Sequence, residues 1–481
     1  MKFAALFFLS LAPLGSAGST GYFTPEHRVS GIGVARDDIS ADLLAARTDL
    51  MIQSQTFGIM REALAVPGAK RITSDPKLQS IFRIAAERSH LPATLIEAIA
   101  YLESWGDPKA ESITGPKGIM QISTATAHDM GLKVVQATRY KVTREKVAVK
   151  AKGKKPKFKI LTHKTPYVVT VRDDRLLPDR AIPAAAVYLA GMEQRFGGRD
   201  WAVFAYHCGQ GCVTEMLNLT RHARGIPKED VTVPRMFFSC SPAWNRELYQ
   251  AIQQQMERDY SPTYYFRIMR AEQLLALYRR DPNGFQALSR EFKSDFVTGI
   301  RAPHRLSVWL KRDDLVYRTC DDIRLDAGKR LVKALDRPDY YGYALRLSPD
   351  QPANLEYYSE ASASTVGTLM YVAFETRRLF DELHPHGEKF QPLTVTSLVE
   401  PVDGTHASGN EALFHCSGHV FDLDYAGLPP AEIECLRFVL DDLGWNGYLG
   451  FMEDRGESIH IGCSPASRAF FATIFQEGAA E

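Results

Sequence analysis

The spacing of apolar residues predicts a chain that is helical through much of its length. Apolar side chains recur every three or four residues along 40–64 and 77–88, and Ser40 is of a type that caps helix N-termini. The same spacing predicts later helices at 180–196, from about residue 200 onward, at 266–279 and at 364–383.

The helix predicted for residues 91–103 ends in an acidic residue. Pro92 suits the first helical turn, where its missing N–H group is not needed. Gly106 and Pro108 predict that the helix stops just after Glu103. There, the negative end of the helix dipole and an apolar lining would both disfavour an ionised carboxylate and raise its pKa. Glu103 is therefore a candidate general acid.

Residues 139–172 interrupt the helical pattern. β-Branched residues alternate there with Lys and Arg, and Gly153 occupies the predicted turn, so we expect a basic β-hairpin inserted into a helical domain. One interpretation is a solvated surface hairpin. The alternative is that its cations bind an anionic polymer or an acidic partner protein.

The N-terminus has the pattern of a signal peptide. Lys2 precedes an apolar run at 3–14, and small residues follow, which predicts cleavage near Ala17 and export to the periplasm or the medium of a bacterium. The remaining chain contains no apolar run of about 20 residues, so we expect no transmembrane helix in the mature protein.

The pattern changes again near residue 391, where strands are predicted at 393–399, 412–421 and 458–462. We therefore expect a multidomain protein. Its predicted parts are a signal peptide (1–17), an N-terminal helical segment (18–75), a mainly α domain that contains the hairpin (76–262), a helical connector (263–390) and an α+β domain (391–481).

Charge and cysteine content narrow the functional classes. The 58 Lys and Arg nearly balance the 57 Asp and Glu, which argues against a dedicated nucleic-acid binder. In an exported protein the seven cysteines predict disulfides, with at least one thiol left over because the number is odd. The alternative is zinc–thiolate binding, although regular C-x-x-C pairs are lacking.

Several motifs in the α domain resemble the soluble lytic transglycosylase family. They are Ala100–Ser104, Pro108–Ala110 with Ser112, Gly115–Gln121, and Ala205-Tyr206-His207 with Gly209–Gly211. The resemblance extends from about Lys77 to Arg258 and implies a lysozyme-like, cofactor-free glycan lyase that acts on peptidoglycan. It implies that Glu103 is the catalytic acid/base. It also implies that Ser112, Gln121 and Tyr206 bind the sugar or the carboxyl group, while Met120 walls the groove.

The implied reaction needs a single carboxyl group, whereas ordinary glycosidases use two. Glu103 would protonate the leaving oxygen of the MurNAc–GlcNAc bond and then take the proton from the primary hydroxyl of the muramoyl sugar, which closes a 1,6-anhydro ring. If Asp107 or Glu111 supplied a second carboxylate, the protein would be a water-using muramidase. A non-catalytic wall-binding or assembly factor is the alternative from another class.

The sequence also departs from the family pattern. His207 stands where Asn is usual, and Cys208 and Cys212 flank the glycine loop, so we expect altered hydrogen bonding and a loop that a disulfide could staple. For Met120 and Tyr206, packing in the core is the alternative interpretation.

The C-terminal part resembles zinc D-Ala-D-Ala carboxypeptidases and related wall peptidases. Residues 415–422 fit H-x-x-G-x-x-x-D, and residues 457–460 fit E-x-x-H. The resemblance implies a zinc ion held by His415, Asp422 and His460, with Glu457 as the base that activates the attacking water. His419 is an alternative ligand. The Arg that this family uses to bind a substrate carboxylate is absent after Ser397, so a metal-free wall-binding domain is the competing interpretation.

Overall fold

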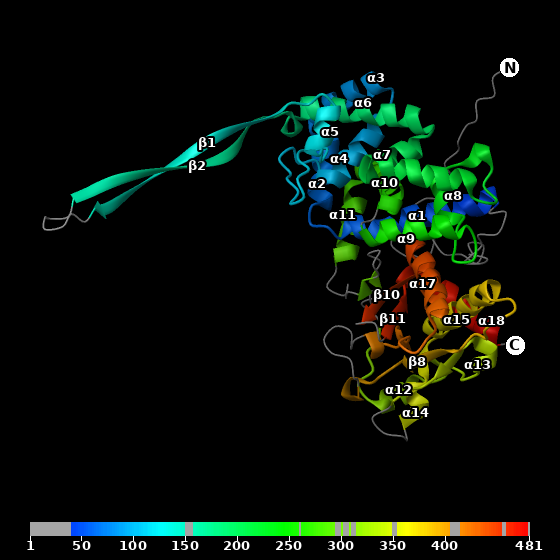
Figure 1. Ribbon diagram of the computed structural model, residues 1–481. Helices are drawn as coiled ribbons and strands as arrows, with labels where there is room; N and C mark the ends of the chain where they lie inside the picture. Colours follow the sequence, from blue (N-terminus) through cyan, green and yellow to red (C-terminus); the bar gives the residue numbers. More distant parts are fainter. Residues whose placement is uncertain are drawn as a thin grey trace, which may run out of the picture. The chain divides into compact units, whose positions relative to one another are not determined.

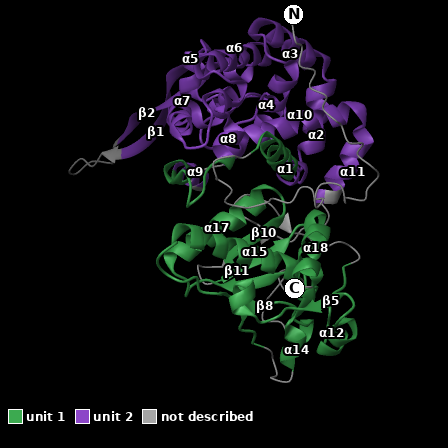
Figure 2. Cartoon of the chain, turned by 90° about the vertical axis from the view of Figure 1, so that its right-hand side faces the viewer, with its two compact units in different colours: residues 1–54, 238–250, 294–481 green, residues 55–237, 251–293 purple. Residues whose placement is uncertain are grey.

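The structure is a computed structural model in which two compact units are described separately (Figure 2). Unit 1 comprises residues 1–54, 238–250 and 294–481, and unit 2 comprises 55–237 and 251–293. The residues that the structure describes are 40–149, 157–258, 261–293, 300–301, 307–308, 314–348, 354–404, 414–454 and 458–479. The predicted signal peptide, the turn at Gly153 and the predicted base Glu457 lie outside these ranges.

Unit 2 consists mainly of helices. They are α2 (Ala65–Ser74), α3 (Pro76–Ser89), α4 (Ala93–Ser104), α5 (Thr124–Asp129), α6 (Pro178–Phe196), α7 (Arg199–His222), α8 (Val233–Phe238), α10 (Tyr264–Arg280) and α11 (Pro282–Lys293). Helix α4 contacts α2, α3 and α10 and buries Leu95 and Ile99. The boundaries between the units fall inside α1 (Ala41–Met60) and near the middle of α9 (Arg246–Arg258).

The helices predicted from apolar spacing are largely confirmed. Ser40 caps α1 through a hydrogen bond from the Leu43 N–H group to its hydroxyl. The predicted helix at 40–64 is too long, because α1 ends at Met60 and a separate helix, α2, begins at Ala65. Helix α6 ends where expected, at Gly197, which has the left-handed conformation (φ 82°) typical of helix C-termini.

The predicted basic hairpin is confirmed and is slightly longer than expected. Strands β1 (Val134–Val149) and β2 (Lys157–Asp173) pair antiparallel in a two-stranded sheet. The hairpin projects away from the helices of unit 2 (Figure 1). At about 3.3 Å per residue it is about 50 Å long. We call these two strands the arm.

Unit 1 is built around a mixed five-stranded sheet with the strand order β10-β11-β9-β8-β6. The strands are β6 (Tyr343–Leu345), β8 (Leu393–Ser397), β9 (Phe421–Asp424), β10 (Leu449–Asp454) and β11 (Ser458–Cys463). Only β6 and β8 pair in parallel. Helices α15 (Ala363–Leu383) and α18 (Arg468–Ala479) pack together, and α17 (Pro430–Trp445) packs on α15 and β10.

Smaller elements complete unit 1. They are β3 (Ile300–Arg301), β4 (Ser307–Val308), α12 (Cys320–Asp326), β5 (Leu331–Lys333), α13 (Pro338–Tyr341), α14 (Leu355–Tyr358) and β7 (Glu360–Ser362). Their shortness explains why the sequence pattern did not separate them from a helical background, because three residues are too few to establish a period of two.

Two expectations about the C-terminal half differ from the structure. The predicted connector at 263–390 is divided, since α10 and α11 belong to unit 2 while the rest belongs to unit 1 and includes strands as well as helices. The strand predicted at 412–421 starts only at Phe421, and residues 414–418 form a helical turn. Its first residues, 412–413, lie outside the described ranges.

The seven cysteines all fall within the described residues, and the structure joins none of them in a disulfide. Cys240 and Cys435 are buried, and burial raises the pKa of each thiol to about 12. The expected disulfides are therefore absent from this structure, and the only metal-ligand cluster among the described residues contains no cysteine. In the same described part of the chain, no helix combines the length and the apolar character needed to cross a membrane.

Candidate active site

Glu103 lies in the last turn of α4, as the sequence predicts. The helix ends one residue before the expected Gly106, because Trp105 itself adopts the left-handed conformation (φ 54°). The Trp105 and Gly106 N–H groups donate to the carbonyls of Tyr101 and Ala100 and so close the helix. The rings of Trp105 and Tyr101 also pack edge to face, with centroids 4.8 Å apart.

The Glu103 side chain is half-buried and bound by a phenol. The Tyr264 hydroxyl donates a hydrogen bond of 2.5 Å to Glu103 Oε1. Burial raises the pKa of Glu103 to about 7, and the Tyr264 hydrogen bond and the positive charge of Arg267 only partly oppose this rise. The raised pKa expected from the sequence is thus confirmed, with burial as its largest cause.

Tyr264 and Arg267 were missed by the sequence analysis. Both lie on α10, beyond Arg258, where the family resemblance was expected to end. His207, which stands where the family usually has Asn, stacks its ring on Tyr264 with centroids 4.6 Å apart and planes 5° apart. The unusual residue therefore supports the group that binds Glu103. The run Tyr264-Tyr265-Phe266 carried no signal beyond that of a buried helix.

Tyr206, predicted to line the site, lies close to Glu103. Its hydroxyl donates to the backbone carbonyl of Met120 at 2.9 Å, and its pKa is raised by burial and by the nearby Glu103 charge. Beyond it, α7 breaks at Gly209 (φ 82°, ψ 163°), so the predicted glycine loop is a kink inside one long helix.

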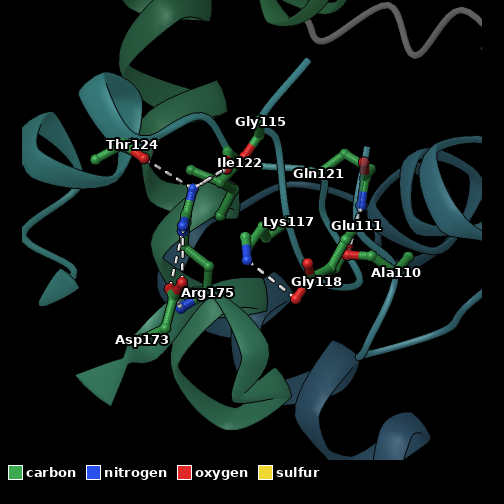
Figure 3. Close-up of polar contacts among 10 residues, drawn as sticks. All are labelled: Ala110, Glu111, Gly115, Lys117, Gly118, Gln121, Ile122, Thr124, Asp173 and Arg175. Carbon is green, nitrogen blue, oxygen red and sulfur yellow. Dashed lines mark hydrogen bonds and ion pairs between the residues drawn. The ribbon is translucent and has the colours of Figure 1, made fainter. Parts of the chain in front are cut away.

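The other predicted substrate-binding residues belong to the loop between α4 and α5. The Gln121 amide nitrogen donates to the carbonyls of Ala110 and Gly118 at 3.2 and 2.9 Å (Figure 3). The hydroxyl of Ser112 is hydrogen-bonded within its own turn, to Thr114. Met120 is only 1% exposed, which matches the alternative of core packing rather than a groove wall. Gln121 thus braces the loop through its backbone carbonyls, and Ser112 braces its own turn through Thr114.

The two acids considered as a second carboxylate make local contacts. Asp107 accepts a hydrogen bond from the Lys109 N–H group at 2.9 Å, within its own turn. Glu111 forms an ion pair with Lys117 at 3.0 Å, and its side chain is 56% exposed (Figure 3). Neither acid is among the groups that shift the pKa of Glu103.

Arg175 joins the base of the arm to this loop (Figure 3). Its guanidinium group is buried and binds both oxygens of Asp173, at 2.8 and 2.7 Å. The same group donates to the Ile122 carbonyl at 3.2 Å and to the Thr124 hydroxyl at 3.1 Å. Arg175 also presents its own carbonyl to Gly118, where an added Cβ atom would lie 1.9 Å from that oxygen. The loop that follows α4 is thus fixed to the end of β2.

A second cluster of titratable groups lies in unit 1. His415, Asp422 and His460 offer ligand atoms that lie within 4.8 Å of one another. Asp422 on β9 and His460 on β11 are cross-strand partners, so they share one face of the sheet. Asp422 Oδ1 lies 2.7 Å from His460 Nδ1 and 3.3 Å from His415 Nε2. The structure therefore brings together the three residues predicted as zinc ligands.

The surroundings of this cluster hold His415 in place. Its Nδ1 atom lies 3.1 Å from the Leu398 carbonyl and 2.9 Å from the Ser397 hydroxyl. Burial alone would lower the pKa of His415, but the charges of Asp422 and Glu400 raise it to about 9. Glu400 accepts a hydrogen bond from Ser397. An acid therefore lies in the region after Ser397 where the zinc D-Ala-D-Ala carboxypeptidases would have their Arg.

His419 does not join this cluster. Its Nε2 atom lies 3.3 Å from Asp314, which also binds Arg468 through both carboxylate oxygens. The alternative ligand suggested by the sequence is thus used in a separate ion-pair group.

Comparisons with known proteins agree with the first site. Residues 80–151 match the family model described as Transglycosylase SLT domain. The chain is 32% identical over 143 residues to the peptidoglycan transglycosylase gp16 of Escherichia phage T7, a match that covers 30% of this chain and 8% of the phage protein. It is 28% identical over 192 residues to the membrane-bound lytic murein transglycosylase F of Saccharophagus degradans, covering 37% of this chain and 35% of that protein. The match thus spans less than a tenth of the phage protein and about a third of the Saccharophagus protein.

A solved structure was also matched. It is an inactive mutant of the lytic transglycosylase Slt from Pseudomonas aeruginosa, 18% identical, aligned over 54% of this chain and 33% of that chain with a TM-score of 0.26. The SLT match contains Glu103 and the loop after α4, whereas Tyr206 and Tyr264 lie beyond it.

Proposed function

We propose that unit 2 is a lytic transglycosylase that cleaves the MurNAc–GlcNAc bond of peptidoglycan, with Glu103 as its sole acid/base. The observation that carries this proposal is the half-buried Glu103 carboxyl group, with a pKa of about 7, inside the stretch that matches the SLT family. A general acid works best when its pKa lies near the working pH, because it must both hold and release a proton. The names of the matched relatives support the same substrate.

The Glu103 carboxyl group acts twice in the proposed reaction, first as an acid and then as a base. The protonated carboxyl group gives its proton to the glycosidic oxygen as the bond to the muramoyl C1 breaks. The resulting carboxylate then takes the proton of the C6 hydroxyl, whose oxygen bonds to C1 and closes the 1,6-anhydro ring. The Tyr264 hydroxyl and the Arg267 charge both favour the carboxylate form, so they stabilise Glu103 between these two transfers.

The local contacts of Asp107 and Glu111 favour this reaction over hydrolysis. An inverting or retaining glycosidase needs a second carboxyl group about 5–10 Å from the acid, on the other side of the bond. Glu111 is instead paired with Lys117 at the surface, and Asp107 caps its own turn. We therefore prefer the lyase to the two alternatives, a muramidase and a non-catalytic wall-binding factor.

Digestion of purified sacculi followed by mass spectrometry tests the proposal. The full chain should release anhydro-muropeptides, which are lighter by one water molecule than hydrolytic products. Glu103→Gln should reduce their release by at least about a thousandfold, since general acid and base catalysis are both lost. Glu111→Gln, a matched change at an exposed acid, should leave release unchanged. Products with reducing ends would identify a muramidase, and activity that survives Glu103→Gln would refute the assigned role.

A second candidate function concerns unit 1, and we propose that His415, Asp422 and His460 bind a zinc ion. Two imidazoles and one carboxylate are the donor set of a catalytic zinc site, and their proximity supports the assignment. The contact of His415 Nδ1 with the Leu398 carbonyl leaves Nε2 for the metal, and a backbone carbonyl on the other ring nitrogen is a common way of orienting a metal-binding histidine. Bound zinc would supply Lewis acidity for cleavage of a peptide crosslink. The predicted base Glu457 stays a prediction.

Metal analysis of the purified full chain tests the second candidate. We expect about one zinc ion per chain after incubation with zinc and dialysis. His415→Ala should lose the ion, while His386→Ala, which removes an exposed histidine of unit 1, should retain it. Equal zinc content in both variants, or none in the parent protein, would exclude the site. Export to the periplasm or the medium stays a prediction that agrees with a wall substrate.

A further inference from the structure

The arm concentrates the positive charge of the chain. Its two strands, Val134–Val149 and Lys157–Asp173, contain eight Lys or Arg residues but only two acids, Glu145 and Asp173. The whole chain has 58 basic and 57 acidic residues, so everything outside the arm is net acidic. Charge that is separated in this way acts over a distance on charged partners rather than on the fold.

The strand register shows which side chains share a face of the arm. Residues directly opposite each other in an antiparallel pair point to the same side. One face carries Tyr140, Val142, Arg144, Lys146, Phe158, Ile160 and Lys164. The other carries Arg139, Lys141, Glu145, Lys159, Leu161, His163 and Tyr167. Lys146 Nζ lies 4.7 Å from the Phe158 ring centroid, as expected for neighbours on one face.

Both faces therefore mix cations with exposed aromatic and aliphatic groups. Tyr140, Phe158 and Ile160 are 58–63% exposed, and the cations beside them are exposed as well. A hairpin that lies in a membrane surface needs an apolar face opposite a charged one. The centre of a protein–protein interface is depleted of charge. In the outer part of the arm both faces carry cations, at Arg139, Lys141, Arg144 and Lys146 on β1 and at Lys159 and Lys164 on β2, so this part meets neither condition.

A long polymer with repeated negative charges fits this pattern. These cations extend from Arg139 to Lys146 on β1 and from Lys159 to Lys164 on β2, a length of about 25 Å at about 3.3 Å per residue, so a linear polyanion could contact several of them at once from either side. The aromatic rings between them suit a carbohydrate, whose apolar C–H faces pack on such rings while pendant carboxylates meet Lys and Arg. Arg172 is excluded from this set because it binds Asp174 at 2.9 Å.

We propose that the arm is a second binding surface, separate from Glu103, for a glycan whose side groups carry carboxylates. The proposal rests on the proposed function only in that peptidoglycan, with its carboxylate-bearing stem peptides, would be the polymer at both places. The ion pair of Arg175 with Asp173 holds the base of the arm to the loop after α4. The arm is thus anchored in unit 2, where Arg175 also contacts Ile122 and Thr124 at the end of that loop.

Binding to sacculi tests the proposal in the full chain that carries Glu103→Gln, so that the polymer stays intact. The arm variant combines Lys141→Gln, Arg144→Gln, Lys159→Gln and Lys164→Gln, which are exposed positions on both faces. The matched control combines Lys70→Gln, Lys77→Gln, Arg88→Gln and Lys228→Gln, which removes the same number of exposed charges from the rest of unit 2. We expect at least about tenfold weaker binding for the arm variant and little change for the control.

Two further measurements decide the chemistry. Amidation of the sacculus carboxylates should weaken binding of the parent protein to the level of the arm variant, and added salt should do the same. Equal binding by arm variant and control, or binding that survives amidation, would overturn the proposal. Binding to anionic lipid vesicles in place of sacculi would overturn it in favour of a membrane surface. Circular dichroism checks that the arm variant is folded.

The test of the lyase proposal is independent of the test of the arm proposal. With Glu103 restored, the release of anhydro-muropeptides reports on catalysis, whereas sedimentation with sacculi reports on the arm. A protein that binds through the arm but releases no anhydro product would refute the lyase and leave the arm proposal intact. The reverse result would refute the arm proposal alone.

Discussion

At the scale of single residues, the burial of Glu103 lowers the stability of the folded protein at pH values where its carboxyl group is ionised. Its pKa is raised from 4.5 to about 7, so the folded protein binds this proton more tightly than the unfolded chain does. The contribution of Glu103 to stability is therefore greatest below pH 4.5 and is lost as the pH rises through 7. A buried acid whose raised pKa lowers stability at neutral pH is a candidate for a chemical role.

Glu103→Gln should stabilise the protein at pH 8, because the neutral amide does not require a buried charge. The expected gain is about 2–3 kcal/mol at pH 8 and much less at pH 5.5, where Glu103 is already protonated in the folded state. Urea unfolding at the two pH values measures it. Glu111→Gln, at an exposed acid, is the control and should show no gain that depends on pH. A gain of equal size at both pH values would contradict the raised pKa.

Tyr264→Phe removes the phenol that favours the Glu103 carboxylate. The pKa of Glu103 should then rise further, and the alkaline limb of the kcat/KM profile should move up by about one pH unit. The kcat value should fall because the carboxylate formed between the two proton transfers loses its donor. Tyr265→Phe, the adjacent position on α10, is the control. An unshifted alkaline limb would show that Tyr264 does not act through Glu103.

The sequence predicts a site residue well when neighbouring residues in the chain determine its position, and poorly when distant ones do. Glu103 follows from local rules, since Pro92 and Gly106 mark the helix ends and the surrounding motif marks the acid. Tyr264 reaches Glu103 across 161 positions, by packing of α10 on α4, and no local pattern encodes that contact. Gln121 was assigned a role toward the sugar, but its left-handed backbone (φ 45°) and backbone hydrogen bonds appear only in three dimensions.

At the scale of elements, the loop after α4 depends on one close backbone approach. Gly118 has φ 80°, and an added Cβ atom would lie 1.9 Å from the Arg175 carbonyl oxygen. Gly115 lies in the same loop with φ 109°, but an added Cβ atom there would meet nothing within 4 Å. A substitution at Gly115 therefore tests backbone strain alone, whereas one at Gly118 adds a steric conflict with Arg175.

Gly118→Ala should destabilise unit 2 by more than about 2 kcal/mol, because the Arg175 carbonyl must move and the ion pair with Asp173 must move with it. Gly115→Ala should cost only the strain of a positive φ, about 1–2 kcal/mol. Denaturant unfolding of both variants measures the difference. Equal losses would indicate that the contact with Arg175 adjusts freely.

Elements were predictable where they are long. The helices and the arm repeat their pattern over many residues, so period and boundary signals reinforce one another. Strands β5, β6 and β7 have three residues each and depend on partners distant in the chain, so no local pattern marks them. The same reason explains why β9 begins at Phe421 rather than near residue 412.

At the scale of the whole molecule, the chain passes between the units several times. Unit 2 takes α10 and α11 from beyond the boundary predicted at residue 262, and unit 1 takes residues 238–250 from within the predicted α domain. Composition and linkers indicate only where a chain changes character along its length. They do not indicate that a later helix returns to an earlier core.

Truncation tests this division. A chain of residues 40–293 retains α10, which supplies Tyr264 and the fully buried Phe266, while a chain of residues 40–262 lacks both. The longer chain should unfold cooperatively and keep the Glu103-dependent activity, although its short pieces of unit 1 lose their partners. The shorter chain should lose the packing on α4 and unfold at a markedly lower temperature. Equal melting temperatures would show that α10 is dispensable to unit 2.

The two strands of the arm have a consequence for association between copies. Among the residues that the structure describes, each strand pairs only with the other, so the outer edge of each leaves backbone N–H and C=O groups open to a further strand. Lys and Arg along such edges keep neighbouring copies apart by repulsion. We expect that a polyanion bound to the arm cancels this repulsion. Occupancy of the arm would then govern self-association, with copies remaining apart in free solution and gathering where the polymer is dense.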